Sequence, residues 1–358
     1  MSELLLRSYH EVRGALFHPE AGWEVPSNYG PLDSEVLAVR RDVGMIDFSD
    51  RAKVRVTGAD RVTFLDGLVT ADVKLLTPNT SAYALVLNDK SRVLGDLRVL
   101  ALDDAFVLDI EAAQKDSLLA YFRKMLVSDD VTLEDLGACG HIEVHGPRAP
   151  DVVSATLGVD VRGLSLDAVK SFPLDRRRTG YAVRVRTVGE AGYVIWGPGV
   201  ALENVWAVLD RANVPPFGRD AFDVLRLEAG MPRFGADMSG ETLALEVVPE
   251  AAISFTKGCY TGQEVVARGT YVGHMNRKLL GLRIDGDVPP SRRDLVRKEG
   301  KDVGFVTSGA WSPTKGWVIG LALLRVDDVR NTDVLFIDHH GWDLRARLHP
   351  LPFVWGSA

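Results

Sequence analysis

The sequence predicts an α+β protein that consists of two related lobes followed by an antiparallel β-barrel. Three observations support this fold class. First, strand patterns with alternating apolar residues and helical patterns follow one another through the first part of the chain. Second, an alternating strand that ends in glycine and precedes a helical pattern occurs twice, at residues 53–58 and 141–146. Third, short alternating stretches separated by glycine, proline and aspartate follow residue 277 without clear helical patterns.

The composition is that of a globular protein with a large core. With 358 residues, 46% of them hydrophobic, the chain is long enough for two or three domains. A net charge of −7 argues against broad binding to nucleic acids or acidic membranes, because such binding needs a cationic surface. No run approaches ~18 apolar residues, so we expect no membrane span. The first residues lack the apolar length of a signal peptide, so we expect a cytoplasmic protein with Cys139 and Cys259 reduced.

The first half of the chain predicts a helix capped by Ser34, a strand before Phe48 and then a regular lobe. That lobe begins with a strand, a turn at Gly58 and a helix bearing Phe64 and Leu65. A three-stranded meander follows, and a helix should pack on it because its apolar residues have helical spacing. The predicted elements are 34–42 (helix), 45–48, 53–57, 83–87, 92–100 and 106–110 (strands), and 118–126 (helix).

The second lobe and the barrel are predicted from the same two periodicities. In the second lobe, the last helix should be closed by Gly230, a residue suited to the left-handed position past a helix end. The predicted elements are a strand at 141–146, a helix at 152–157, a hairpin at 181–187 and 193–196, and helices at 200–212 and 219–229. Barrel strands are predicted at 279–284, 302–307, 318–324, 334–337 and 344–348. We therefore divide the chain into 1–276, with lobes at about 51–140 and at 1–50 with 141–276, and a barrel at 277–358.

The stretch Lys257–Glu264 (KGCYTGQE) combines a candidate reactive residue with a helix start. Thr261 and Glu264 have the spacing of a capping box, with Tyr260 and Val265 placed for a hydrophobic staple. A short helix should therefore begin near Gly262, run through Arg268 and stop at Gly269.

Cys259 lies two residues before that cap, in a loop with a neighbouring glycine. The positive end of the helix and the ammonium group of Lys257 would both favour a thiolate. The alternative is a small buried residue on a tight turn, which is the commoner fate of a free cysteine.

Several segments resemble the superfamily of the glycine-cleavage-system T-protein, a folate-dependent aminomethyltransferase. They are 43–47, 58–65, 189–193, 226–230 and 307–309. Within this superfamily, Lys257–Glu264 is similar to the signature of the YgfZ-type folate-binding iron–sulfur maturation proteins. The resemblance implies three domains around a central folate-binding cavity, with the barrel as the last domain.

The resemblance further implies an accessory factor that binds tetrahydrofolate and helps to assemble or repair iron–sulfur clusters in transiently bound client proteins. Cys259 would supply the thiol and Lys257 would activate it. The other residues of the motif are Gly258, Tyr260, Thr261, Gly262, Gln263 and Glu264, with Arg268 beyond it. Folate contacts are expected from Asp96, Glu190, Tyr193 and Arg226. For Arg226 a salt bridge within its helix or between lobes is an equal alternative.

Two departures from the aminomethyltransferases bear on function. Those enzymes carry paired aspartates where this chain keeps only Asp96, and C–N bond cleavage needs an acid or base near the substrate amine. Val194 stands where they place a glutamate that suits the paired N–H donors of the pterin. Two other functions stay open: a folate-dependent aminomethyl- or methyltransferase that uses Asp96, and a non-catalytic folate-binding scaffold.

Other chemistry finds little support in the sequence. The histidines form no pattern with carboxylates or cysteines typical of a zinc or iron–sulfur site, so we expect no resident metal. No Walker A sequence or complete dinucleotide fingerprint is present. The run Arg176–Arg178 is typical of a solvated turn, so we expect no stable nucleic-acid binding.

Overall fold

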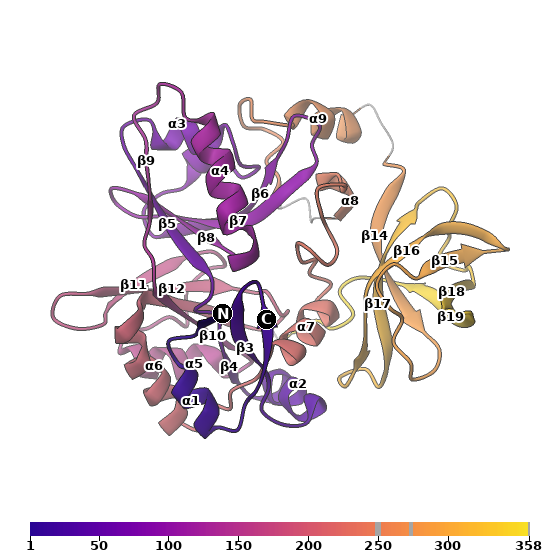
Figure 1. Cartoon of the computed structure of the whole chain (residues 1–358), viewed down its shortest axis with the longest axis horizontal. Coiled ribbons are helices and arrows are strands. Elements are labelled where there is room, and N and C mark those ends of the chain that lie inside the picture. Colours follow the sequence, from indigo (N-terminus) through magenta and orange to yellow (C-terminus); the bar gives the residue numbers. More distant parts are fainter. Residues whose placement is uncertain (248–251, 272–274, 357–358) are drawn as a thin grey trace.

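The computed structural model describes residues 1–247, 252–271 and 275–356, whose strands form two five-stranded sheets, a small N-terminal sheet and a closed barrel (Figure 1). Both five-stranded sheets are antiparallel throughout. The α+β class and the C-terminal antiparallel barrel predicted from the sequence are confirmed.

The first sheet contains the predicted meander in the strand order β6-β7-β8-β5-β9. Its outer face carries Val54, Leu97 and Leu108, which pack with the apolar sides of α3 and α4. The strands are β5 (Ala52–Thr57), β6 (Thr80–Leu87), β7 (Val93–Ala101), β8 (Phe106–Ile110) and β9 (Thr132–Asp135), and the helices are α3 (Arg61–Asp66) and α4 (Lys115–Met125), with short 3-10 helices η1 (Val73–Leu75) and η2 (Ala112–Gln114). Strand β9 has only four residues, which is too short for a clear alternating pattern, and the sequence did not predict it.

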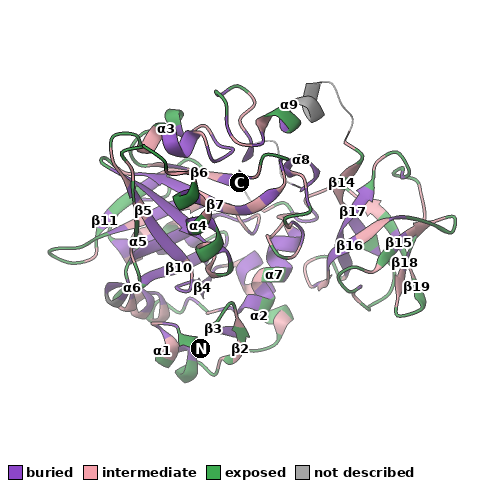
Figure 2. Ribbon diagram, turned by 45° about the horizontal axis from the view of Figure 1, so that its top comes forward, coloured by how far each residue is buried: buried purple, intermediate pink, exposed green. Residues whose placement is uncertain are grey.

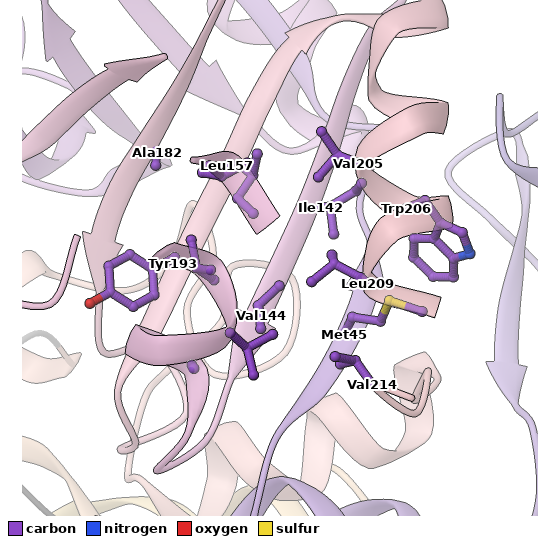
Figure 3. Packing of buried hydrophobic residues seen from close by; sticks show 14 of the residues in the cluster. Met45, Ile142, Val144, Leu157, Ala182, Tyr193, Val205, Trp206, Leu209 and Val214 are labelled. Carbon is purple, nitrogen blue, oxygen red and sulfur yellow. The ribbon is translucent and has the colours of Figure 1, made fainter. Parts of the chain in front are cut away.

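The second sheet has the order β11-β12-β13-β10-β4 and buries its outer face under two helices. Ile142, Val144 and Tyr193 pack there with Trp206 in one apolar core (Figure 3). The strands are β4 (Gly44–Asp47), β10 (Cys139–His145), β11 (Val169–Pro173), β12 (Thr179–Val185) and β13 (Gly192–Pro198), and the helices are α5 (Ala149–Leu157) and α6 (Gly199–Arg211).

The inner faces of the two sheets meet, so their strands are largely buried in Figure 2. One part of this contact is apolar: Leu100 and Val107 of the first sheet pack with Val194 and Trp196 of the second. Another part is charged. Lys53 Nζ on β5 lies 3.1 Å from Asp109 Oδ1 on β8 and 3.0 Å from His141 Nδ1 on β10.

The N-terminal region forms a small sheet and two helices that contact the second lobe. The prediction that Ser34 caps a helix is wrong, because α2 begins at Leu32 after Pro31 and has no side-chain cap. Glu35 instead binds the backbone N–H groups of Tyr29 and Gly30. The elements are β1 (Ser2–Glu3), α1 (Arg7–Val12), β2 (Leu16–Glu20), β3 (Trp23–Asn28) and α2 (Leu32–Arg41), and α7 (Arg219–Glu228) packs against α2 and β3.

The barrel closes in the order β14-β17-β16-β15-β18-β19. Its strands are β14 (Arg277–Ile284), β15 (Leu295–Lys298), β16 (Lys301–Ser312), β17 (Trp317–Arg325), β18 (Leu335–His339) and β19 (Trp342–His349). The sequence pattern missed β15, which has four residues and a register shift in its pairing with β16. Two short helices, α8 (Ala244–Val247) and α9 (Gln263–Tyr271), precede the barrel. The division of the chain at residue 276 stays a prediction.

We predict that Asp109→Asn destabilises the protein far more than Asp104→Asn. Asp109 is buried and binds Lys53 and Arg51, so its loss leaves buried cations uncompensated, at a cost of roughly 3–5 kcal/mol. Asp104 binds Arg55 at the exposed surface, where a pair contributes less than about 1 kcal/mol. Urea unfolding of both variants measures the difference.

The difference in unfolding free energy between the wild type and Asp109→Asn should depend on pH. Burial would raise the pKa of Asp109, but Arg51, Lys53 and His141 outweigh it and lower the pKa below 3.8. The stabilisation is therefore present above about pH 4 and is lost as the pH falls below it. Equal stabilities of the wild type and Asp109→Asn at neutral pH would contradict this account.

Candidate functional site

Asp96 is positioned by the alternation of β7. Because neighbouring side chains of a strand point to opposite faces, Leu97 enters the outer core while Asp96 points to the inner face. The Tyr83 hydroxyl donates to Asp96 Oδ2 at 2.8 Å, and Gln114 Nε2 donates to Asp96 Oδ1 at 2.8 Å. Two hydrogen bonds leave other lone pairs of this carboxylate free to accept from a ligand.

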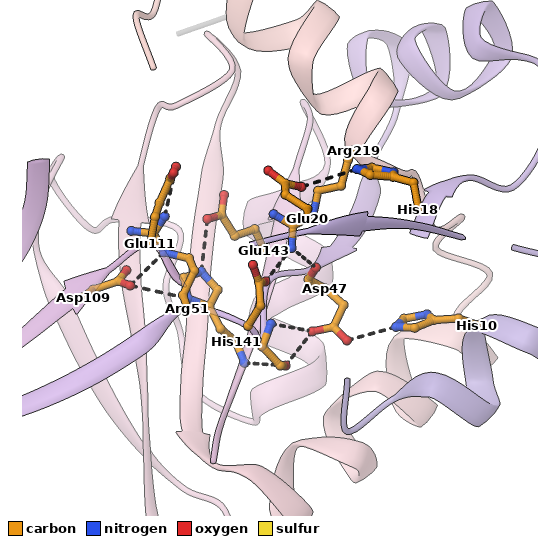
Figure 4. Close-up of polar contacts among 12 residues, drawn as sticks. His10, His18, Glu20, Asp47, Arg51, Asp109, Glu111, His141, Glu143 and Arg219 are labelled. Atoms are coloured by element: carbon orange, nitrogen blue, oxygen red, sulfur yellow. Dashed lines mark hydrogen bonds and ion pairs between the residues drawn. The ribbon is translucent and has the colours of Figure 1, made fainter. Parts of the chain in front are cut away.

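Glu111 follows the end of β8 and lies beside two arginines. Its Oε1 atom is 3.5 Å from Arg51 Nη1 and 3.5 Å from Arg233 Nε. Figure 4 shows Arg51 between Asp109 and Glu111. Burial raises the pKa of Glu111, and the charge of Asp96 adds to this effect, while the two arginines act against it.

We call Tyr83, Asp96, Gln114, Glu111, Arg51 and Arg233 the junction cluster, because they join β6, β7, the turn after β8, the start of β5 and the segment after α7. Solvent still reaches this cluster, since the side chains of Glu111 and Arg233 keep 21% and 28% of their surfaces accessible. The carboxyl groups of the cluster are therefore accessible to solvent, although most of the residues around them are buried.

A second carboxylate on the inner face, Glu143, is held by histidines. His141 Nε2 lies 3.1 Å from Glu143 Oε1, and His145 Nε2 lies 2.7 Å from Glu143 Oε2. Burial acts to raise the pKa of Glu143, but the hydrogen bonds from the two histidines outweigh it and lower the pKa. Glu143 lies opposite Val194 in the register of β10 and β13. Although the chain has valine at position 194, a carboxylate is therefore present on the neighbouring strand.

The predicted folate contact of Arg226 stays a prediction, and the structure shows this side chain bound to protein groups. Its guanidinium is buried and donates to Asp223 Oδ1 at 2.8 Å, to Ser308 Oγ at 2.9 Å and to Asp237. The bond to Ser308 joins α7 to the barrel strand β16. The salt-bridge alternative is therefore the one that the structure supports.

Glu190 and Tyr193 are both buried and hydrogen-bonded to other parts of the protein. Glu190 is buried and accepts from Arg40 Nη1 at 3.3 Å. Tyr193 is fully buried in the outer core of the second sheet, where its hydroxyl donates to the Val161 carbonyl at 2.9 Å. The alternation of β13 explains this placement, because Val194 rather than Tyr193 points to the inner face.

Lys257 is buried and bound to backbone groups of the first lobe. Its side chain is only 1% exposed, and its ammonium group donates to the carbonyls of Asp66, Val69 and Ala71 at 2.6–2.8 Å. Three carbonyl partners leave this cation committed to the end of α3 and the segment after it. Lys257 therefore anchors the motif to the first lobe, while its predicted effect on the thiol of Cys259 stays a prediction.

The rest of the motif forms a tightly placed turn around the start of α9. Gly262 has a φ of +84°, and a Cβ there would lie 2.6 Å from the Asn88 carbonyl oxygen, so only glycine fits. Ser91 Oγ donates to the Gly262 carbonyl, Thr261 Oγ1 donates to the Gly67 carbonyl at 3.4 Å, and Gln263 Nε2 donates to the Lys257 carbonyl at 3.4 Å.

Helix α9 corrects two details of the predicted helix. It begins at Gln263, as expected, but continues through Gly269 to Tyr271, because glycine is tolerated within a helix at a modest cost. Val265 is exposed while Val266 is buried with Tyr260, so the expected staple is replaced by a contact one residue later. The side chain of Arg268 lies outside the described residues.

Sequence reasoning missed most of the junction cluster. Only Asp96 was named, whereas Glu111 and Gln114 could have been found from the meander, because an antiparallel register brings the end of β8 opposite the middle of β7. Arg51 precedes the strand β5, and Arg233 follows the helix α7. No local sequence pattern identifies either residue. Within the described ranges, no group of three or more His, Cys, Asp and Glu side chains could hold a metal ion. No helix in these ranges is long and apolar enough to cross a membrane.

Comparison with known proteins identifies similar chains over nearly the whole length. Residues 6–257 match the GCVT N-terminal domain, and residues 277–354 match the glycine cleavage T-protein C-terminal barrel domain. The aminomethyltransferase of Thermosipho melanesiensis is 32% identical, with 97% of this chain and 96% of the relative covered. That of Cutibacterium acnes is 30% identical, with 97% of each chain covered. The crystal structure of glycine cleavage system aminomethyltransferase T from Bartonella henselae superposes with a TM-score of 0.91 at 26% identity, covering 99% of this chain and 98% of that chain.

These comparisons support the superfamily predicted from the sequence and favour its aminomethyltransferase alternative. None of these matches bears on iron–sulfur maturation or separates the YgfZ-type branch from the rest.

We predict that a maleimide modifies one cysteine in the native protein and two after unfolding. Cys259 is exposed, whereas Cys139 is buried on β10 and burial raises the pKa of its thiol. Mass spectrometry of the native, labelled protein should place the modification on Cys259. Modification of Cys139 at a comparable rate would contradict the described packing of β10.

Proposed function

The chain belongs to the glycine cleavage T-protein family, and we propose that it is a folate-dependent aminomethyltransferase whose reaction takes place at the junction cluster. The observation that supports this most strongly is the position of Asp96. It is the family-like carboxylate named from the sequence, and it lies at the solvent-accessible junction of the lobes with two ordered donors.

Tetrahydrofolate is the one-carbon acceptor of this family, and the residues present fit such a ligand. A reduced pterin offers several N–H donors, which suit carboxylates that still have lone pairs. Asp96 has lone pairs beyond those that Tyr83 and Gln114 occupy. Glu143 is less suited to this contact, because two histidines already bind its oxygens. We therefore assign Asp96 as the principal folate contact.

The proposed reaction joins the aminomethyl carbon to the folate. An aminomethylated lipoyl thioether, R–S–CH₂–NH₃⁺, and tetrahydrofolate give R–SH, methylene-tetrahydrofolate and NH₄⁺. The C–N and C–S bonds break, two C–N bonds to the folate form, and the two folate N–H protons pass to the leaving sulfur and nitrogen. Asp96 lies where it can accept and return such a proton, which is the acid–base function this chemistry needs.

The two family matches on either side of residue 276 support the proposed division of the chain. In this organisation the barrel follows the two lobes and contacts α7 through Arg226 and Ser308. We propose that the barrel fixes α7, and with it the segment that contains Arg233, at the junction cluster.

A second candidate function rests on the exposed thiol of Cys259 in a loop anchored by Lys257. This is the iron–sulfur maturation function of the YgfZ-type proteins, with client proteins as transient partners. Cells that depend on this chain should lose cluster-enzyme activity with Cys259→Ala if the thiol acts there. Unchanged activity would remove this candidate.

We predict that Asp96→Asn lowers kcat for aminomethyl transfer by roughly 10²–10⁴-fold, because a positioned acid–base group contributes that much. The assay measures ammonia and methylene-tetrahydrofolate released from an aminomethylated lipoyl donor. Asp104→Asn is the matched control, since Asp104 lies in an exposed pair with Arg55. A wild type that binds tetrahydrofolate without releasing ammonia would instead indicate a folate-binding scaffold.

A further inference from the structure

Asp96 lies on β7, and Glu111 directly follows the end of the neighbouring strand β8. The register of β7 and β8 ends with the pair Leu97 and Ile110. Because the backbone of Glu111 is still extended, continuing this register by one position brings Glu111 opposite Asp96. Residues at opposed positions of an antiparallel pair have Cβ atoms about 4.5–5.5 Å apart. Glu111 shares the inner face with Asp109, two residues earlier, and Arg51 contacts both. The two acidic side chains therefore lie on one face at one level.

Gln114 fixes these two positions relative to one another. Its backbone N–H donates to the Glu111 carbonyl at 2.9 Å within the turn after β8. Its side-chain amide accepts from the Asp96 N–H and donates to Asp96 Oδ1, both at 2.8 Å. One residue thus holds the turn that bears Glu111 against the strand that bears Asp96.

The arginines beside Glu111 have closer carboxylate partners. Arg51 Nε donates to Asp109 Oδ1 at 2.8 Å, while its distance to Glu111 is 3.5 Å. Arg233 binds Glu20 of β2 more closely than it binds Glu111. Like charges at opposite positions of a sheet destabilise it, so a further positive charge would stabilise the pair of Asp96 and Glu111.

We propose that Asp96 and Glu111 together bind the protonated amine of the aminomethyl donor. This inference rests on the proposed function and names the part of the substrate that the site recognises. A primary ammonium group has three N–H donors, which two carboxylates accept, and its charge removes the repulsion between them.

This recognition suits the chemistry of the leaving group. In the balanced reaction the nitrogen departs with the electron pair of the C–N bond and ends as NH₄⁺. Two carboxylates favour the protonated amine, which is the form that can leave. Glu111 is thus a substrate-binding residue, while Asp96 also serves the proton transfers.

A proton competes with the ammonium group for this carboxyl pair. The pKa of Glu111 lies above its usual 4.5, mainly because of burial and partly because of Asp96. As the pH falls through this pKa, Glu111 becomes neutral, and the KM for the donor should rise. The charged and titratable groups that face Glu111 are Asp96 on β7, Tyr83 on β6, Arg51 before β5, Arg219 on α7 and Arg233 after α7.

The test compares Glu111→Gln with Glu20→Gln. Glu20 binds the same Arg233 from the N-terminal sheet but does not lie opposite Asp96, so it controls for release of the arginine. Initial rates are measured against the aminomethylated lipoyl donor at saturating tetrahydrofolate over a pH series. We expect Glu111→Gln to raise the KM for the donor roughly tenfold at neutral pH. The further increase in KM that the wild type shows at acid pH should be absent in this variant. Glu20→Gln should keep the acid rise.

The outcomes separate this inference from the proposed function. If the wild type transfers no aminomethyl group, the proposed function fails. A second outcome is that the wild type is active, that the KM of Glu111→Gln stays within about twofold of the wild-type KM, and that this KM still increases at acid pH. That outcome overturns only the assignment of Glu111 to the ammonium group. Should Glu111→Gln not fold, Glu111→Asp replaces it, with an intermediate KM expected and a wild-type KM overturning the proposal.

A probe that cannot react gives a second readout. 2-(Methylthio)ethylammonium is a stable thioether with a primary ammonium group, and calorimetry in the presence of tetrahydrofolate measures its binding. We expect the affinity to fall roughly tenfold in Glu111→Gln but not in Glu20→Gln. Equal affinities for the wild type and Glu111→Gln would overturn the proposal.

Discussion

The contact between the inner faces of the two five-stranded sheets determines the rest of the structure. Each sheet buries its outer face under its own helices, so the remaining face must be covered by the other sheet. The apolar part of this contact, around Val107 and Trp196, excludes water. The charged part, from Lys53 through Asp109 to His141, is stable only because each group has partners, since a single buried charge costs several kcal/mol.

The junction cluster lies where this contact gives way to accessible polar groups. There the carboxyl groups are bound by hydroxyl, amide and shared arginine donors, which leave some of their lone pairs free to accept from a ligand. The N-terminal sheet reaches the same place through Glu20, and the segment after α7 reaches it through Arg233. Because Arg226 ties α7 to β16, the barrel takes part in the architecture of the site. The site is thus assembled from segments that are far apart in the sequence.

Local sequence patterns predicted the helices and strands well, but they predicted the side-chain contacts poorly. The meander, α4, the hairpin of β12 and β13, and five barrel strands follow from periodicity, and Gly230 closes α7 with a φ of +68° as expected. The partners of long charged side chains do not follow from periodicity. Lys257 was expected to activate a thiol two residues away, yet its partners are carbonyls almost two hundred residues earlier. Tyr193 was expected at the ligand because it lies in a family-like segment, but strand alternation turns it into the outer core. The strand register could have identified Glu111 once β7 and β8 were recognised.

The central claim is that a reduced folate binds at the junction cluster, and hydrogen exchange of the backbone measures this most directly. Exchange rates should be compared with and without saturating tetrahydrofolate. The account predicts slower exchange in β7 around Asp96 and in the turn from Glu111 to Gln114, because a ligand would stabilise both segments. Protection confined to the loop around Cys259, with no change in β7, would contradict it.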